Sequence, residues 1–368
     1  MISCSKIPAF DCMGKSDFPA DQFITSDKAK NIADILCKYI NNEKVPCIQL
    51  TIIDSLGNKW TLTTGTSDIK RRSPADDNDL LRLASITKTF TATVIFSLID
   101  QGKLSLDDKL ITFFPDFKEA KEVTIKNLLN HSSGIKELLT LPDILTSSTL
   151  FTTKIWDINS IIKTISAKKL VFQTGTDFQY SNTNYVLLGL IAEKIEQKKI
   201  DQLYHDYIFN PLSITKISLV PQEAIPAKLI SGFDRKLLPT PGLYEVTSQN
   251  TAWASAAFTS GALVGNSEQT ALFFHKLLSG KIISVNSLNN MEEFGEKKNP
   301  DNEYQKYFGH GLFKFEINGK TYFGHEGLFV GADNVACFRT SDKVTITILS
   351  NISTFNKFNL LKEIDDLL

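Results

Sequence analysis

Apolar residues recur at helical spacing near the start of the chain, after an aperiodic stretch over residues 1–25 that we expect to be an extended lead-in. Four of them fall on one stripe of a helix, namely Ile32, Ile35, Leu36 and Ile40. Ser26 or Asp27 can cap the helix start because short polar side chains accept hydrogen bonds from the first free N–H groups. The pattern therefore predicts an amphipathic helix over residues 27–42.

Two runs in which apolar and polar residues alternate follow at residues 48–53 and 59–64, and both are rich in β-branched side chains. Alternation of apolar and polar residues is typical of a strand with one buried face. Residues 54–58, Asp-Ser-Leu-Gly-Asn, separate the runs and can form a tight turn. We therefore expect a β-hairpin.

The next strong pattern is an apolar helix beginning at Ser85, with Val94, Ile95 and Leu98 at helical spacing and Gly102 as its end. Beyond residue 104 the chain changes to short helical patterns broken by Pro and Gly, among them residues 124–131 and 182–196. These patterns predict a mostly helical insert over residues 104–254.

Strand-like runs dominate the last third of the chain, at residues 311–317, 320–324, 334–339 and 344–350, and a helix closes it. Strands at both ends of the chain favour an α+β fold (an α/β sandwich) with one antiparallel sheet flanked by helices. We therefore expect the sheet domain to comprise residues 26–103 and 255–368. The active site should lie where this domain meets the insert.

The composition of the 368 residues is ordinary for a globular protein, with 42% hydrophobic residues, 22% charged residues and a net charge of −1. Because no basic stripe exists, we expect no nucleic-acid partner. No apolar run is long enough to cross a bilayer, so no transmembrane segment is expected.

The five cysteines include no C-x-x-C pair, and the chain has no H-E-x-x-H motif, so we predict neither a metal nor a cofactor. Two disulfides, Cys4–Cys12 and Cys37–Cys47, are compatible with an oxidising compartment, and buried reduced thiols are the equal alternative. The start of the chain lacks the pattern of a secretory signal. The protein is expected to be periplasmic or secreted if a signal was trimmed, and cytoplasmic otherwise.

The pair Ser85 and Lys88 carries the first candidate chemistry. Residues at i and i+3 share a helix face, which places the lysine amine beside the serine hydroxyl as the base that a serine nucleophile needs. The same S-x-x-K spacing recurs six more times, for example at Ser213 and Lys216, but only Ser85 begins an apolar helix. We therefore select Ser85 as the nucleophile.

Tyr180 and Asn182 form a second candidate, just before the helical pattern of residues 182–196. A phenol held between ammonium groups has its deprotonated form favoured, so Tyr180 is a candidate base. Asn182 is a candidate donor to a substrate carbonyl. The alternative is structural, since Ser181 or Asn182 can serve as an ordinary helix N-cap.

The third candidate is the run Gly324-His325-Glu326-Gly327-Leu328. Glycines at the end of a strand often mark close approach of the backbone to a ligand. A backbone N–H from this strand and one from the Ser85 helix can together bind an oxyanion. The alternative is a hairpin or bulge that carries a surface histidine.

Ser-Ile-Thr-Lys, Tyr-Ser-Asn and His-Glu-Gly, in this order, resemble the three motifs of the penicillin-recognising serine hydrolases. The similar subgroup contains class C β-lactamases, D-alanyl-D-alanine carboxypeptidases, D-aminopeptidases and related esterases. The flanking residues 124–134 and 260–266 resemble further segments of that family, and the resemblance covers about residues 29–368. It implies a β-lactamase/transpeptidase-like fold and a serine hydrolase that forms an acyl-enzyme on amide or ester bonds. The partner it implies is a small-molecule or peptide substrate, such as a peptidoglycan-derived peptide or a β-lactam.

The resemblance also implies a role for each motif residue. Ser85 is acylated, Lys88 and Tyr180 pass its proton to the leaving group, and Asn182 orients the substrate amide. The backbone amides of Ser85 and Leu328 hold the oxyanion. An alternative function is a catalytically weak penicillin-binding sensor or scaffold.

The third motif departs from the family pattern. His325 takes a place often filled by lysine, and Glu326 precedes Gly327 where threonine is usual. A carboxylate at position 326 that faced the cleft would repel a carboxylate substrate. This favours an esterase, or an amidase for amine-bearing substrates, at least as much as an enzyme for β-lactams or peptidoglycan-derived peptides.

Overall fold

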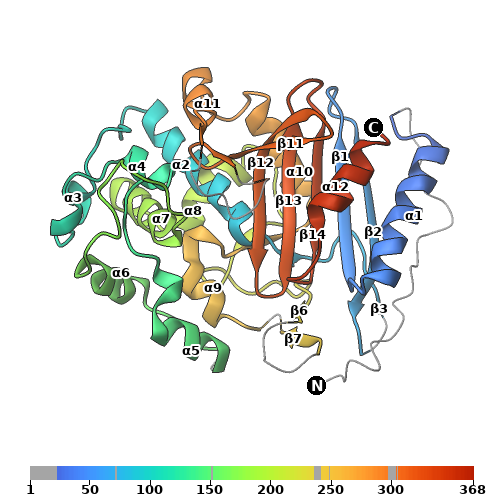
Figure 1. The fold of residues 1–368 in the computed structure, drawn as a ribbon, viewed down its shortest axis with the longest axis horizontal. Helices are drawn as coiled ribbons and strands as arrows, with labels where there is room; N and C mark the ends of the chain where they lie inside the picture. The colour runs from blue at the N-terminus through green and yellow to red at the C-terminus, as the bar shows by residue number, and fades with distance from the viewer. Residues whose placement is uncertain are drawn as a thin grey trace.

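A large antiparallel sheet forms the centre of the protein (Figure 1). The computed structural model describes residues 23–70, 73–150, 152–235, 242–247, 249–296, 304 and 306–368. In spatial order the strands are β3 (Ser73–Pro74), β2 (Lys59–Asp68), β1 (Cys47–Ile53), β14 (Thr345–Ser350), β13 (Ala332–Arg339), β12 (Lys320–Phe329), β11 (Phe313–Ile317), β10 (Tyr307–Phe308) and β9 (Gly295–Glu296). Because β1 pairs with β14, the two ends of the chain build one sheet, and the predicted α+β fold is confirmed.

Two layers of helices cover the sheet (Figure 1), and the principal ones are α1 (Ser26–Asn42), α12 (Lys357–Asp365), α2 (Thr87–Asp100) and α10 (Ser267–Leu278). Successive side chains of a strand point to opposite faces. Ile48, Leu50 and Ile52 of β1 accordingly pack in one apolar core with α1 and α12. Cys47 lies in the other core, with α2 and α10. The sheet is thus the middle layer of an α/β sandwich.

The face of β1 on which the Cys47 side chain lies explains why one of the two predicted disulfides does not form. Cys37 of α1 is disulfide-bonded, whereas Cys47 is a free, buried thiol. The predicted Cys37–Cys47 bond is therefore wrong, because the Cys47 side chain points into the core on the face of the sheet opposite α1. Cys337 is also free and buried. The Cys4–Cys12 pair and most of the predicted lead-in lie outside the described residues.

The β1–β2 hairpin follows the sequence pattern closely. Leu50 pairs with Leu62, in register with the predicted alternation. The Asp54 carboxylate accepts hydrogen bonds from the N–H groups of Leu56, at 2.9 Å, and Asn58, at 2.8 Å. Gly57 supplies a φ of +88°, which other residues rarely adopt. The hairpin prediction is confirmed.

The helical part of the protein lies to one side of the sheet (Figure 1). Its helices are α3 (Leu110–Phe113), α4 (Ile125–Leu129), α5 (Pro142–Leu150), α6 (Ile158–Ser166), α7 (Asn182–Glu196), α8 (Ile200–Tyr204) and α9 (Ala252–Ala257), and α11 (Val285–Met291) follows later in the chain. Two small sheets accompany them, formed by β4 (Leu81–Arg82), β8 (Leu263–Gly265) and β5 (Ser218–Leu219), and by β6 (Gly232–Asp234) and β7 (Tyr244–Val246). Segments predicted only as helical insert thus also contribute short strands. In the described part of the chain, no helix is long and apolar enough to cross a membrane.

Helix α2 lies between the helical part and the sheet, and every residue from Thr87 to Leu98 is buried. Its threonines bond to neighbouring carbonyls, as Thr89 does to Gly311 at 2.9 Å and Thr91 to Thr259 at 2.6 Å. These bonds satisfy the buried hydroxyls, which would otherwise oppose burial of the helix. The N-terminus of α2 is therefore held between the two parts of the protein, where the site was expected.

Candidate active site

Ser85 lies in a short 3₁₀ turn, η2 (Ala84–Ile86), immediately before α2, rather than in the α-helix itself. Ala84 adopts a left-handed φ of +51°, which is costly for a residue with a side chain. Two bonds hold the turn: Leu83 N–H donates to the Leu263 carbonyl at 2.9 Å, and the Thr87 hydroxyl donates to the Ala84 carbonyl at 2.7 Å. The fold thus maintains the unfavourable backbone conformation of Ala84, directly before Ser85.

The Lys88 amine contacts Ser85 directly. Its Nζ atom lies 3.0 Å from Ser85 Oγ, 2.7 Å from Asn182 Oδ1 and 2.7 Å from the Ser260 carbonyl oxygen. Burial lowers the pKa of Lys88 to about 7, and the Glu137 carboxylate opposes the shift. When the amine is neutral, Asn182 and Ser260 accept its two hydrogens, and its lone pair faces the serine hydroxyl.

Tyr180 joins the same cluster. Lys88 Nζ lies 4.7 Å from the centroid of its ring, and the Ser85 hydroxyl hydrogen-bonds to its phenol oxygen. Burial raises the pKa of Tyr180 well above its ordinary value, the carboxylates of Glu326 and Glu137 raise it further, and the bond from Ser85 opposes the rise. The predicted phenolate is therefore wrong: burial keeps the proton on the Tyr180 oxygen, and the phenol remains a proton donor.

Asn182 is the first residue of α7 and links Lys88 to Glu137, which the sequence interpretation missed. Its Oδ1 accepts from Lys88, and its Nδ2 donates to Glu137 Oε1 at 3.2 Å. The Asn182 N–H donates to Glu137 Oε2 at 2.5 Å. Glu137 thereby caps the N-terminus of α7. Ser181 occupies the N-cap position of α7, as the structural alternative expected, but its side chain makes no cap bond.

Glu137 lies outside the regular elements, just before a 3₁₀ turn at Leu138–Thr140. It follows residues 124–134, the segment that resembles the family, by only three positions. This proximity is the one sequence feature that could have marked Glu137 as a candidate site residue. No spacing rule connects Glu137 with Asn182, since 45 residues separate them. The contact exists because α4 and α7 pack against each other.

His325 lies inside strand β12, paired with Ala336, and its side chain is fully buried. The alternative of a surface histidine is therefore wrong. Its Nδ1 lies 2.6 Å from the Glu326 carbonyl oxygen, which fixes the hydrogen on Nδ1. Burial, together with the Lys88 ammonium, lowers the pKa of His325 to about 3. The third motif thus supplies a neutral imidazole.

Glu326 does not present its carboxylate to a substrate. Its side chain is 8% exposed and pairs with Lys357 Nζ at 2.8 Å. Lys357, at the start of α12, also pairs with Asp333. The condition that Glu326 faces the cleft is therefore not met. If the site discriminates against substrates that carry a carboxylate, a group other than Glu326 must be responsible.

Gly327 brings strand β12 against the nucleophile turn. A Cβ atom at this position would come within 2.3 Å of the Leu83 carbonyl oxygen. The absence of a side chain lets β12 pack on η2. The Leu328 side chain is 54% exposed. The oxyanion hole formed by the backbone amides of Ser85 and Leu328 stays a prediction.

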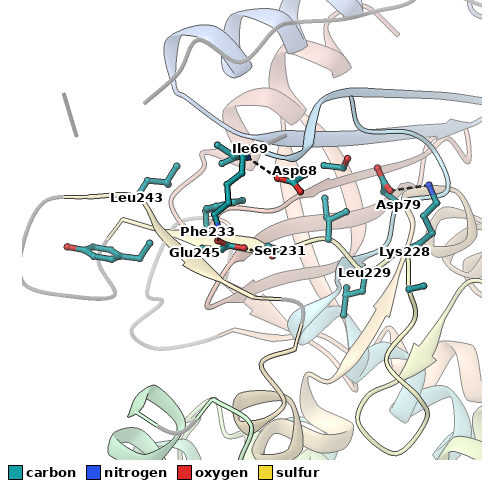
Figure 2. Close-up of a pocket in the computed structure, with 14 residues that line it drawn as sticks. Asp68, Ile69, Asp79, Lys228, Leu229, Ser231, Phe233, Leu243 and Glu245 are labelled. Atoms are coloured by element: carbon teal, nitrogen blue, oxygen red, sulfur yellow. Dashed lines mark hydrogen bonds and ion pairs between the residues drawn. The ribbon is translucent and has the colours of Figure 1, made fainter. Parts of the chain in front are cut away.

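A separate cavity of about 590 Å³ lies between the end of β2 and strands β6 and β7 (Figure 2). Its charged groups are paired, with Lys70 at 3.0 Å from Glu245 and Lys228 at 3.7 Å from Asp79. None of the described residues that line it belongs to the three motifs. Among the described residues, no group of three His, Cys, Asp or Glu side chains could hold a metal ion.

The profile of the family described as Beta-lactamase matches residues 32–367 of the chain. The chain belongs to this family. Among curated relatives of this β-lactamase family member, Protein flp of Staphylococcus aureus strain MW2 is 29% identical over 196 residues, which are 52% of this chain and 38% of that protein. The chain spans less than half the length of the curated relatives it matches.

Solved structures have the same fold. D-amino acid amidase from Ochrobactrum anthropi SV3, in complex with D-phenylalanine, superposes with a TM-score of 0.84 at 22% identity, covering 93% of this chain and 99% of that one. The octameric penicillin-binding protein homologue from Pyrococcus abyssi gives a TM-score of 0.78 at 23% identity, covering 90% and 75%. At these identities the likeness establishes the β-lactamase-family fold.

Proposed function

We propose that the protein is a serine hydrolase that cleaves amide or ester bonds through an acyl-enzyme on Ser85, with Lys88 as general base. The observation that carries the proposal is the position of the buried Lys88 amine, 3.0 Å from Ser85 Oγ. A general base is most effective when its pKa lies near the working pH, and the pKa of Lys88 is about 7.

In acylation, the Ser85 oxygen attacks the substrate carbonyl carbon and its proton passes to the Lys88 amine. The Ser85 and Leu328 amides bind the oxyanion of the tetrahedral intermediate. The scissile bond then breaks as Tyr180 donates its phenol proton to the departing amine or alcohol, and the proton held by Lys88 restores the phenol. In deacylation, a water molecule gives a proton to Lys88 while its oxygen attacks the acyl carbon. The bond from the acyl carbon to Ser85 Oγ then breaks, the proton held by Lys88 passes to Ser85 Oγ, and the free serine and neutral lysine are restored.

The proposed substrate class is a small amide whose acyl part carries a free amine. The half-buried carboxylate of Glu137 lies at the edge of the catalytic cluster and influences both Lys88 and Tyr180 electrostatically. An ammonium group is attracted to such a carboxylate, and a substrate carboxylate is repelled by it. The fold shared with D-amino acid amidase is compatible with this class.

A substrate panel tests both parts of the proposal. Purified wild type and Ser85→Ala are assayed with D-phenylalanine amide, a short p-nitrophenyl ester, a D-Ala-D-Ala peptide and nitrocefin. We expect Ser85-dependent turnover of the amide and the ester to exceed that of the other two. Faster turnover of nitrocefin or the peptide would contradict the substrate class. A fluorescent penicillin retained on Ser85 without any turnover would instead indicate the sensor function.

We further propose that the protein works in an oxidising compartment, because Cys37 forms a disulfide and such bonds are rare in the cytosol. Alkylation of the native protein with and without prior reduction tests this proposal. A Cys37 thiol that is fully alkylated without reduction, in protein isolated from its natural source, would contradict it.

A further inference from the structure

His131 follows α4 and lies in the segment of residues 124–134 that resembles the family, but it takes no part in the proposed mechanism so far. Its side chain is fully buried, and its backbone adopts a left-handed φ of +60°. Such a conformation costs energy for a residue with a side chain and persists only where the surrounding contacts hold it. The contacts of His131 therefore need a physical explanation.

His131 binds the chain on both sides of Tyr180. Its carbonyl oxygen accepts a hydrogen bond from the N–H of Gln179 at 3.1 Å, and its Nδ1 accepts one from the N–H of Ser181 at 3.1 Å. Because a backbone N–H can only donate, Nδ1 is an acceptor here and carries no hydrogen. The two residues that flank Tyr180 are thus fixed to one histidine.

The imidazole of His131 also packs against the ring of Tyr180. The two ring centroids are 4.4 Å apart, and the ring planes are tilted by 33°. The ring of Phe308 lies 4.7 Å from the same imidazole. At the far end of Tyr180, the phenol oxygen is hydrogen-bonded to the Ser85 hydroxyl. The direction in which Tyr180 extends toward the nucleophile therefore depends on His131.

The position of the Tyr180 hydroxyl matters because this group gives its proton to the departing amine or alcohol in the proposed mechanism. A proton donor must lie within hydrogen-bond reach of the atom that it protonates. The hydroxyl is the atom of tyrosine farthest from the backbone, so a small rotation of the backbone at Tyr180 displaces it strongly. A displacement of about 1 Å costs about 10²-fold in rate.

We propose that His131 is a positioning residue that holds Tyr180 where the phenol protonates the leaving group. This inference rests on the proposed function, because it needs a hydrolase that acts through Ser85. In the step concerned, the bond from the acyl carbon to the leaving oxygen or nitrogen breaks, its electron pair stays on the leaving atom, and the proton comes from the Tyr180 phenol. His131 acts through Tyr180 in this step.

The choice of leaving group isolates this step. p-Nitrophenol departs as a stable anion and needs no proton, whereas ethanol departs only when its oxygen is protonated. The acetate esters of p-nitrophenol, phenol, trifluoroethanol and ethanol share one acyl group and differ in how much they need a proton donor. The measured quantity is kcat/KM for each ester, which reports acylation.

Four variants separate the contacts of His131. His131→Asn keeps an acceptor, because Oδ1 takes the place of Nδ1, and asparagine tolerates a left-handed φ. His131→Phe keeps a ring against Tyr180 but has no acceptor. Tyr180→Phe removes the proton donor itself. His275→Phe replaces another buried histidine, on α10, and is the matched control.

We expect His131→Phe to lower kcat/KM for ethyl acetate by about 10²-fold while p-nitrophenyl acetate stays within about threefold of wild type. His131→Asn should lose about threefold to tenfold on ethyl acetate, because the acceptor is kept and the ring contact is lost. Tyr180→Phe should lose about 10²- to 10⁴-fold on the same ester. His275→Phe should keep the leaving-group dependence of wild type.

A double variant tests whether His131 acts through Tyr180. Two changes that remove the same interaction do not add. Once the phenol is gone, its position no longer matters. We therefore expect His131→Phe combined with Tyr180→Phe to hydrolyse ethyl acetate as slowly as Tyr180→Phe alone.

Equal losses on all four esters in a folded His131 variant, or a further loss on ethyl acetate in the double variant, would overturn the inference and assign His131 a general structural role. The melting temperature and fluorophosphonate labelling of Ser85 identify folded variants, and either His131→Asn or His131→Phe is sufficient for the comparison. A wild type with the same leaving-group dependence as Tyr180→Phe would exclude Tyr180 as the donor, and this inference with it. A wild type without Ser85-dependent hydrolysis of p-nitrophenyl acetate would instead refute the proposed function itself.

Discussion

The fully buried Lys88 amine lies 3.0 Å from Ser85 Oγ, with its other two hydrogen bonds directed to fixed oxygen acceptors. This arrangement leaves the Lys88 lone pair directed at Ser85, so the proton is transferred from the Ser85 hydroxyl to the Lys88 amine. The amine must lose its proton before it can accept one from Ser85, and burial brings that loss close to neutral pH.

The first prediction concerns pH. The pKa of Lys88 is lowered to about 7, so the neutral base is present above that pH and is lost below it. We expect kcat/KM for an uncharged ester to rise with pH through about 7 and then to level off. Lys88→Met should lower kcat by about 10²- to 10⁴-fold, as expected for loss of a general base. A profile that is flat between about pH 6 and pH 9, over the range where this residue should titrate, would exclude Lys88 as the base.

The second prediction concerns Glu137, whose carboxylate raises the pKa of Lys88. In Glu137→Gln this carboxylate charge is removed, so the pKa of Lys88 should fall further. The rise of kcat/KM with pH should then occur at lower pH. The same variant should lose about 10-fold or more in kcat/KM for D-phenylalanine amide, because a nearby ion pair with the substrate ammonium is gone.

A matched substrate controls for the cap that Glu137 provides to α7. 3-Phenylpropionamide has the same ring and amide but no amine. Glu137→Gln should change its kcat/KM far less than that of the amino-acid amide. Equal losses on the two amides would assign Glu137 a structural role only.

The third prediction concerns Gly327. In Gly327→Ala the new methyl group meets the Leu83 carbonyl oxygen and pushes β12 away from the nucleophile turn. We expect kcat to fall by about 10²- to 10³-fold, the effect of losing one oxyanion donor. Gly295→Ala is the control, since its nearest neighbour is 4.0 Å away and its φ is unstrained. Similar activities of the two variants would show that the close approach of β12 has no catalytic role.

The fourth prediction concerns the ion pairs of Lys357 with Glu326 and Asp333. Lys357→Met leaves two buried carboxylates without their cation, which should destabilise the protein by about 3–5 kcal/mol. Lys30→Met, which removes an exposed pair with Asp34, should leave the melting temperature almost unchanged. Equal melting temperatures for the two variants would mean that the buried ion pairs do not stabilise the fold.

Local patterns predicted the elements that make up most of the sheet. The alternation in residues 48–64 predicted the β1–β2 hairpin, and the i, i+3 spacing of Ser85 and Lys88 placed the base beside the nucleophile. Both follow from short-range geometry, since strand and helix periods determine which side chains share a face. Such relationships can be predicted from the sequence without knowledge of the tertiary fold.

Contacts between residues that are distant in sequence could not be predicted from local patterns. The pairing of Glu326 with Lys357 spans 31 positions and depends on how α12 lies over the sheet. The protonation of Tyr180 depends on burial and on the nearby carboxylates of Glu326 and Glu137, and neither effect is visible in the motif itself. Cys47 is a similar case, because its distance from Cys37 in sequence does not indicate that the sheet separates them.

The proposed acyl-enzyme can be observed directly. Wild type is mixed with p-nitrophenyl acetate, quenched in acid within the burst and digested, and the peptide containing Ser85 is examined by mass spectrometry. We expect one acetyl group on Ser85 in the wild type and none on this peptide in Ser85→Ala, which should also show no burst. Turnover by the wild type without a modified Ser85, or equal turnover by Ser85→Ala, would contradict a serine hydrolase built on Ser85 and Lys88.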